Sequence, residues 1–479
     1  MANYPKNRET ISAIFAIAFV SLFLLFGFVA GFSLAVYALT VVPAALIAFF
    51  HPRSGLFAII FLTFIFERFF TLSPIILGES EYKIYPLDVM LLAIIFGTFL
   101  QFLKGQLGIR FKKADFLILG FAALSSLYGL ASIFILNHEA ALSFSSAKNY
   151  AFYALLYFAT YLLVRTKEDF LGLVKFAVAG AIGIIGFLFY GALSGQGLWS
   201  EYTPLSTEGV RILAFTHGYY LSIVSIFAFA YILVKKKDAF ASAFVFLLPV
   251  WGIGIVGSMM RHLWISIAAA FFAVLVLAGK ETRGSAKRLL GGYFFVAFFV
   301  VAAVFYAASL LPNSKINDAI GEVTGVVGHR VTSIADSSDE SIFWRNVVWS
   351  EAFKEYRKNP LFGTGFGKYL SVEIGSYREF VEMRNMHNSF LVLLVQMGLV
   401  SAVVLAGAVW ILLKKVLEKI RTVDGMQIAR IATVGILCLQ AAAFMFQPYL
   451  ETNLLGIFFW INLGLMRSLG RENEQTGGN

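Results

Sequence analysis

The chain has 479 residues, of which 59% are apolar and 14% charged, whereas about 25% of the residues in soluble domains are charged. This composition excludes a soluble globular domain and predicts an all-α polytopic membrane protein. The net charge of +10 is more typical of basic cytoplasmic loops than of a nucleic-acid partner. The single cysteine, Cys438, lies in an apolar run, so neither a disulfide framework nor a cysteine-based metal site is available.

Apolar runs long enough to cross a hydrocarbon core of ~30 Å recur along the chain and predict about 12–14 transmembrane helices. The runs between polar breaks cover residues 11–30, 32–50, 55–73, 86–103, 114–136, 147–164, 169–192, 212–234, 239–257, 260–279, 289–311, 386–413, 429–447 and 450–468. The first run is longer than a signal-peptide core, so we expect it to be retained as a helix. The expected organisation is about eleven spans in 1–311, a large outer loop in 312–385, about three spans in 386–470 and a cytoplasmic tail in 471–479.

Basic residues are distributed unevenly between the two sides of the predicted membrane domain. If the N-terminus is cytoplasmic, the inner segments hold 23 lysines and arginines, and the short outer segments hold four: Lys83, Lys148, Arg211 and Arg261. This imbalance is the positive-inside pattern, and it predicts that both termini are cytoplasmic. The loop at 312–385 carries nine basic residues on the outer side, but long translocated loops escape the charge rule.

The outer loop contains one segment with helical spacing. Residues 342–358 mix apolar and basic side chains, which predicts a helix lying at the membrane interface. An Asn-Pro dipeptide at 359–360 ends it, because proline cannot continue a helix. Gly363, Gly365 and Gly367 follow. Such a glycine run is more often a tight turn, although its backbone N–H groups can also bind an anion.

Four arginines lie at membrane edges on the outer side: Arg211, Arg261, Arg345 and Arg384. A cation at a span boundary is most often an anchor that snorkels to the interface. However, the short outer segments hold few other cations, and a guanidinium can bind phosphate oxygens through two parallel hydrogen bonds. We expect Arg211, Arg261 and Arg345 to form a diphosphate-binding site, with Arg384 in a supporting role.

His387 is the prominent neutral base near the outer boundary, where it precedes a long apolar run. A single histidine at such a boundary is more often a packing or anchoring residue. Arg384 lies three residues earlier, and on one α-helix the two side chains would share a face. The arginine charge would then favour a neutral, proton-accepting imidazole. His387 is therefore the candidate general base.

The spacing around His387 resembles that of the O-antigen ligase and polymerase superfamily of bacterial membrane glycosyltransferases. The family pattern is a histidine followed by Asn, Ser or Gln, nine residues, a glycine, two residues, and then Gly, Thr or Tyr. In this chain His387, Asn388 and Gly398 match the pattern, and Ser401 departs mildly from it at the last position.

The preceding segment is also similar to the family's large periplasmic loop. The family pattern there is an arginine, a tryptophan four residues later, Asn-Pro, and a Gly-x-Gly-x-Gly run. The corresponding residues are Arg345, Trp349, Asn359, Pro360, Gly363, Gly365 and Gly367. Arg211, and Ser258 together with Arg261, resemble two further family positions. The likeness covers roughly residues 205–415.

The resemblance implies an O-antigen ligase of lipopolysaccharide biosynthesis, which transfers a polysaccharide from undecaprenyl diphosphate to an acceptor sugar on the lipid A core. It implies inverting, metal-independent transfer at the periplasmic face of the bacterial inner membrane, with His387 as general base and without a cofactor. The implied partners are the lipid-linked glycan donor, the acceptor glycan and membrane lipid, without nucleic acid. The chemistry agrees, because a diphosphate neutralised by arginines leaves readily and one base then suffices.

Two alternatives share parts of this description. A polymerase or a protein O-oligosaccharyltransferase of the same superfamily uses the same donor and base, and differs in its acceptor. A lipid-linked glycan flippase or another transporter shares the span count, but transporters tend to have related halves and charged groups near mid-membrane. The charges expected inside spans are few, namely Glu67, Arg68 and Lys175. Glycosyl transfer is therefore the favoured hypothesis.

Overall fold

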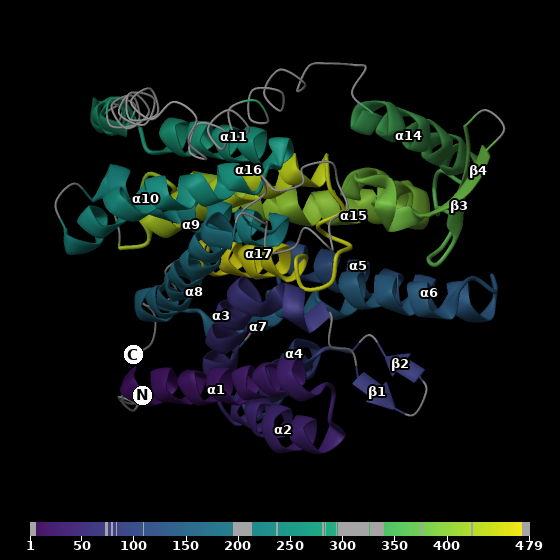
Figure 1. Ribbon diagram of the computed structural model, residues 1–479, viewed down its shortest axis with the longest axis horizontal. Coiled ribbons are helices and arrows are strands. Elements are labelled where there is room, and N and C mark those ends of the chain that lie inside the picture. The colour runs from purple at the N-terminus through teal and green to yellow at the C-terminus, as the bar shows by residue number, and fades with distance from the viewer. Residues whose placement is uncertain are drawn as a thin grey trace. The chain divides into compact units, whose positions relative to one another are not determined.

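The computed structural model describes residues 6–71, 75–77, 80–82, 84–108, 110–194, 213–235, 238–279, 282, 284–293, 295, 325, 340–374, 377–422 and 425–471 (Figure 1). Three predicted features lie largely or wholly outside these residues: the span at 289–311, Arg211 and the tail at 471–479. All three stay predictions.

The described residues confirm an all-α polytopic membrane protein. Eight of their helices are long and apolar enough to cross a membrane: α1 (Lys6–Ala30), α4 (Pro86–Leu103), α5 (Lys113–Phe134), α8 (Lys167–Ser194), α9 (Phe215–Val234), α10 (Ala239–Gly257), α15 (Ser389–Lys419) and α16 (Gln427–Phe444). Four further helices have apolar stretches of 10–17 residues: α2 (Leu34–Phe50), α3 (Pro52–Thr71, apolar over Pro52–Phe66), α11 (Arg261–Leu277) and α17 (Ile457–Leu469). These helices follow the predicted spans, because a chain in lipid must satisfy its backbone hydrogen bonds within each segment.

The chain divides into two compact units. Unit 1 contains Met1–Gly180, Arg345–Arg430 and Phe444–Asn479, and unit 2 contains Ala181–Trp344 and Ile431–Ala443. Each unit therefore collects segments that are far apart in the sequence. His387 and Arg345 both belong to unit 1, whereas Arg261 belongs to unit 2.

The core of unit 1 is built around α15, which packs against α5, and α17, which packs against α7 (Leu155–Leu163). Its interior is rich in aromatic side chains, and Tyr150, Tyr153, Tyr157 and Trp460 have no exposed surface. Aromatic residues bury large areas, but a buried tyrosine hydroxyl needs a hydrogen-bond partner. The hydroxyls of these three tyrosines each donate to a buried carboxylate.

The predicted span at 147–164 differs from the structure in both start and regularity. The helix begins earlier, as α6 (Ala140–Ala147), and passes through a π-helical turn, η1 (Lys148–Phe152), before it continues as α7. Within η1, Tyr153 N donates to Lys148 O at 3.1 Å. A π turn holds one residue more than an α turn. It turns Lys148, Asn149 and Tyr150 into the interior together.

The expectation that few charges lie inside the spans is wrong. Asp88 at the start of α4 pairs with Lys148 at 2.8 Å, and Asp115 in the first turn of α5 pairs with Arg467 of α17 at 2.9 Å. All four side chains are nearly fully buried, and a tyrosine hydroxyl donates to each carboxylate. These opposite charges and hydrogen bonds offset the cost of removing the ions from water.

One end of unit 1 is rich in arginines. Three arginines donate hydrogen bonds to the carbonyls that end α7, at residues 161–163: Arg53, Arg165 and Arg471. We call this the arginine-rich end. The last residue of α15, Lys419, donates to the carbonyl of Arg471, so His387 at the start of α15 lies at the opposite end. Segments that the charge count assigns to one side of the membrane thus meet at one end of the unit.

In unit 2, α9 is buried along most of its length and packs against α10 and α11. A Cβ atom on Gly218 would lie 2.8 Å from Oγ of Ser258, so the chain approaches closely there. His217 is fully buried and stacks on Phe187 of α8 with ring centroids 5.1 Å apart. Close packing around α9 therefore accounts for the burial of this histidine.

The segment predicted as the outer loop is described mainly from residue 340 onward. Its elements are α14 (Glu340–Lys358), β3 (Tyr369–Ile374), β4 (Tyr377–Glu382) and the 3₁₀ turn η2 (Met383–Met386). The helix α14 confirms the helical prediction for 342–358, whereas the antiparallel hairpin β3–β4 was not predicted. The hairpin lies beside α6 (Figure 1), and Tyr369 donates from its hydroxyl to Glu139 at 2.6 Å. A second short hairpin, β1 (Ile75–Leu77) and β2 (Ser80–Tyr82), separates α3 from α4.

Candidate active site

His387 occupies the junction between η2 and α15. Its backbone is left-handed, with φ 54° and ψ 37°, a conformation that histidine adopts more often than most residues. Asn388 then caps α15, since its side-chain oxygen accepts from Leu391 N at 3.0 Å. The sharp turn places the imidazole at the start of the helix rather than along its side.

Gln447 holds one nitrogen of the His387 ring. The distance from His387 Nδ1 to Gln447 Oε1 is 2.9 Å, and an amide oxygen can only accept. Nδ1 therefore carries the proton, and Nε2 of the neutral ring has the free lone pair that a general base needs. The ring is half-buried.

The surroundings of His387 favour the neutral ring. Burial lowers the pKa of His387, the hydrogen bond to Gln447 opposes this change, and the positive charge of Arg345 lowers the pKa further. The pKa consequently lies below the ordinary value of about 6.5. The imidazole is thus neutral at physiological pH and able to accept a proton.

Arg345 and Trp349 of α14 act on the turn that carries His387. They lie one helical turn apart, and Trp349 Nε1 donates to the carbonyl of Met386 at 2.7 Å. This bond sets the shared face of α14 against the turn that carries His387. The structure therefore brings together three residues that were predicted to belong to one site.

Arg384 does not act as predicted. Residues 383–386 form a 3₁₀ turn and His387 is left-handed, so Arg384 and His387 do not share an α-helical face. Arg384 instead pairs with Glu382 at 2.6 Å and donates to Ser145 Oγ at 3.3 Å. The arginine that lowers the pKa of His387 is Arg345.

The glycine run after α14 docks onto a break in α15. At Gly398 the backbone leaves the helical conformation, with φ 70° and ψ −177°. The break frees backbone groups, which the run supplies with partners: Leu399 N donates to Pro360 O at 2.9 Å, Val400 N to Leu361 O at 3.2 Å, Thr364 N to Val395 O at 2.8 Å, and Gly365 N to Gln396 O at 3.0 Å. The run and the break therefore complete each other's hydrogen bonding.

This docking explains why glycines occupy these positions. A Cβ atom on Gly398 would collide with the carbonyl of Leu361, and one on Gly367 would collide with Ser143. The N–H groups of Gly363 and Gly365 donate to main-chain carbonyls within unit 1. The suggestion that these two groups bind an anion is therefore wrong, because both are already used.

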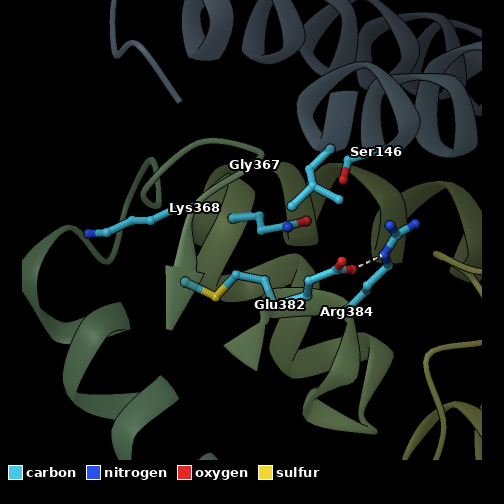
Figure 2. Close-up of a pocket in the computed structure, with 8 residues that line it drawn as sticks. Ser146, Gly367, Lys368, Glu382 and Arg384 are labelled. Atoms are coloured by element: carbon cyan, nitrogen blue, oxygen red, sulfur yellow. Dashed lines mark hydrogen bonds and ion pairs between the residues drawn. The ribbon is translucent and has the colours of Figure 1, made fainter. Parts of the chain in front are cut away.

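A small pocket lies beside η2 (Figure 2). Its volume is about 210 Å³ including the part open to solvent. Glu382 and Arg384 pair along its wall, and Lys368 points away toward its partner Glu355. The remaining lining residues are Leu142, Ser146, Gly367, Met383 and Gln396.

The sequence reasoning missed a second group of polar residues behind His387. Glu451, in the connection between α16 and α17, is fully buried and accepts hydrogen bonds from Ser389 Oγ at 2.6 Å and from the Tyr150 hydroxyl. Burial raises the pKa of Glu451 to about 7, and the bonds from Ser389 and Tyr150 oppose the rise. One signal for it was present, since Glu451 fell inside the predicted span 450–468 and an ionisable residue there indicates a functional site.

The three arginines predicted to bind diphosphate lie in different parts of the chain. Arg345 lies in unit 1 beside His387, Arg261 is the first residue of α11 in unit 2, and Arg211 lies outside the described residues. Ser258 is fully buried and donates to Ile255 O at 2.7 Å. The convergence of these arginines stays a prediction.

Comparison with known proteins adds one finding. Residues 242–406 match the family model described as O-antigen ligase. The match includes every predicted site residue except Arg211, and so contains Arg261, Arg345, His387 and Gly398. No curated protein matches the sequence. The matched region, about a third of the chain, is therefore similar to the O-antigen ligase family, and the described helices are those of a multi-pass membrane protein.

Proposed function

We propose that the protein is an O-antigen ligase that transfers a polysaccharide from undecaprenyl diphosphate to an acceptor sugar of the lipid A core. The observation that carries the proposal is His387, a neutral imidazole with Nδ1 bound by Gln447 and Arg345 alongside. Both His387 and Arg345 lie in the region that matches the O-antigen ligase family.

In the proposed reaction, Nε2 of His387 takes the proton of the acceptor hydroxyl as its oxygen attacks the anomeric carbon of the donor sugar. The bond from that carbon to the phosphate oxygen breaks, and undecaprenyl diphosphate leaves with the electron pair. Attack opposite to the leaving group inverts the anomeric configuration. The donor carries its own leaving group, so the proposal requires no metal and no cofactor.

The diphosphate gains negative charge as it leaves, and arginines can stabilise it. Arg345 is the best supported of the three candidates, because it lies beside His387. We propose that Arg211 and Arg261 bind the same diphosphate through bidentate hydrogen bonds. Arg345 would then serve twice, binding the leaving group and keeping the base neutral.

We propose that the His387 end of unit 1 faces the periplasm, with residues 312–385 as a periplasmic loop and both termini in the cytoplasm. The charge count supports this orientation, since basic residues gather on the cytoplasmic side of bacterial inner-membrane proteins. The arginine-rich end of unit 1, at Arg53, Arg165 and Arg471, would then be cytoplasmic. The undecaprenyl tail of the donor would remain in the lipid.

A reconstitution experiment tests the proposal. Purified protein in proteoliposomes is supplied with an undecaprenyl-diphosphate-linked glycan and a lipid A core acceptor, without ATP and with a metal chelator. Glycan attached to the core supports a ligase. Longer glycans that stay on the lipid diphosphate identify a polymerase, the alternative from the same superfamily. A protein that moves the donor across the membrane without forming product is a flippase, and the proposal is then wrong.

A further inference from the structure

Glu451 joins three segments that are distant in the sequence. Its carboxylate accepts from Ser389 Oγ at 2.6 Å and from the hydroxyl of Tyr150, and its carbonyl accepts from Asn149 Nδ2. Ser389, Tyr150 and Glu451 are each at most 2% exposed. The carboxylate therefore connects the start of α15 to the π turn and to the connection that precedes α17.

The same contacts hold the two segments that carry His387 and Gln447, whose side chains are hydrogen-bonded to each other. Ser389 follows His387 by two positions, and its hydroxyl also lies 3.2 Å from the carbonyl of Gln447. Leu450 N donates to Ser389 Oγ at 3.2 Å. The Ser389 hydroxyl has one proton, which points mainly to the Glu451 carboxylate at 2.6 Å and only weakly to the Gln447 carbonyl at 3.2 Å. Residues 447–451 are thus held firmly at Glu451, and Gln447 lies against the same hydroxyl.

Tyr150 provides a rigid support for this arrangement. Its ring has no exposed surface and stacks on Phe366, with centroids 5.8 Å apart and planes at 13°. Phe366 follows Gly365 in the run that docks onto α15, and its N–H donates 2.7 Å to Ser132 Oγ. The tyrosine hydroxyl that reaches Glu451 therefore has little freedom to move.

We propose that Glu451 is a positioning residue, which holds the Gln447 amide in line with Nδ1 of His387 and so fixes the tautomer and the orientation of the base. The inference rests on the proposed function, in which Nε2 of His387 is the proton acceptor. Glu451 touches neither the base nor the substrate. It acts through Gln447 and Ser389.

The geometry argues against a proton relay from His387 to Glu451. The bonds from Glu451 lead through Ser389 to the main-chain carbonyl of Gln447, whereas His387 is bound by the side-chain oxygen. A carboxamide has no readily exchangeable acidic proton at its oxygen, so it orients the ring without passing the proton on. The proton taken up at Nε2 therefore does not pass through Gln447 to Glu451.

A double-mutant cycle tests this link. Replacing Glu451 by alanine should lower kcat about 10- to 100-fold by misplacing the base, with the KM for the donor unchanged. Glu451→Gln keeps the volume and one acceptor oxygen, and should retain more activity. In a Gln447→Ala background, Glu451→Ala should cause no further loss, because the group it holds is gone. Losses that multiply in the double variant overturn the proposal.

The chain offers a matched pair of tyrosines that separates positioning from general stability. Tyr150→Phe and Tyr157→Phe each remove one buried hydroxyl that donates to a buried carboxylate, Glu451 in the first case and Asp115 in the second. Tyr150→Phe should lower kcat about 10-fold, whereas Tyr157→Phe should leave it unchanged. Equal effects of the two variants on kcat contradict the proposal.

A chemical readout keeps the test independent of glycan transfer. Diethyl pyrocarbonate acylates neutral imidazole, and mass spectrometry of the peptide that contains His387 gives its rate. Glu451→Ala and Gln447→Ala should change this rate severalfold in the same direction, and Tyr157→Phe should not change it. An unchanged rate in Glu451→Ala overturns the inference. If the wild-type protein forms no glycan product but these rates change as expected, the transferase assignment fails and the positioning of His387 by Glu451 stands.

Discussion

Gly363 and Gly398 each pack against the backbone of the segment that contains the other, although 34 residues lie between them. A Cβ atom on Gly363 would lie 2.6 Å from the carbonyl of Gln396, and one on Gly398 would collide with the carbonyl of Leu361. Both have positive φ, at 72° and 70°. The glycine of the histidine motif is therefore the site where the loop after α14 docks, and this docking positions α14 against His387.

We expect Gly398→Ala to destabilise the protein by about 1–3 kcal/mol, because the side chain meets a backbone carbonyl and the conformation disfavours it. Gly407 on the same helix is the matched control, since a Cβ atom there meets only Leu117, at 3.5 Å. Gly407→Ala should be neutral or stabilising by about 0.5–1 kcal/mol. Thermal unfolding of the purified variants measures both, and similar melting temperatures for the two would contradict the docking role.

His387→Ala should lower the transfer rate about 10²- to 10⁴-fold while donor binding and thermal stability stay close to wild type. The physical reason is the loss of the only group proposed to take the acceptor proton. His51, at the end of α2, provides the control, and His51→Ala should transfer at a near-normal rate. Near-normal turnover of His387→Ala would show that His387 is not the general base.

The rate should fall at acid pH, because protonated imidazole cannot act as a base. Burial and Arg345 lower the pKa of His387, so the midpoint of this fall in kcat/KM should lie below about 6.5. Arg345→Gln removes one cause of the lowered pKa, and its midpoint should move to higher pH. A pH profile of kcat/KM for each protein checks this. A midpoint that stays fixed would show that Arg345 does not affect the pKa of His387.

Arg→Lys substitutions at Arg211, Arg261 and Arg345 should each impair transfer by more than the ~0.5 kcal/mol of an exposed charge swap. Lysine keeps the charge but loses the bidentate fork that fits phosphate. Membrane anchors would tolerate the exchange, because lysine snorkels as well as arginine. Donor affinity and turnover of the three variants decide between the two roles.

The proposed orientation can be checked with introduced cysteines. In a Cys438→Ser background, Glu373→Cys in β3 should react with a membrane-impermeant maleimide applied to spheroplasts, because this side chain is 68% exposed. Arg421→Cys after α15 is also exposed but should react only after lysis. The reverse labelling pattern would invert the topology and remove a periplasmic reaction from consideration.

Hydrophobicity alone predicted most of the helices, because α1, α5 and α10 must satisfy their backbone hydrogen bonds within the lipid. The spacing of the motifs also placed His387 and Arg345 in one site, although it gave Arg384 rather than Arg345 as the charge that acts on the histidine. It did not predict Gln447, which follows His387 by 60 residues and meets it only through the packing of α15 and the segment before α17. Nor could periodicity distinguish the 3₁₀ turn at Arg384 from the start of an α-helix.

The π turn η1 has a consequence for how related sequences can differ. Successive residues of a regular α-helix point about 100° apart, so a change of register by one residue redirects every side chain that follows it. The extra residue in η1 lets Lys148 reach Asp88 while Asn149 and Tyr150 reach Glu451. Deleting one residue between 148 and 152 would restore a regular helix and withdraw both sets of contacts at once. Homologues that lack this insertion are therefore expected to have lost the Asp88 ion pair and the Glu451 contacts together, as a single evolutionary unit.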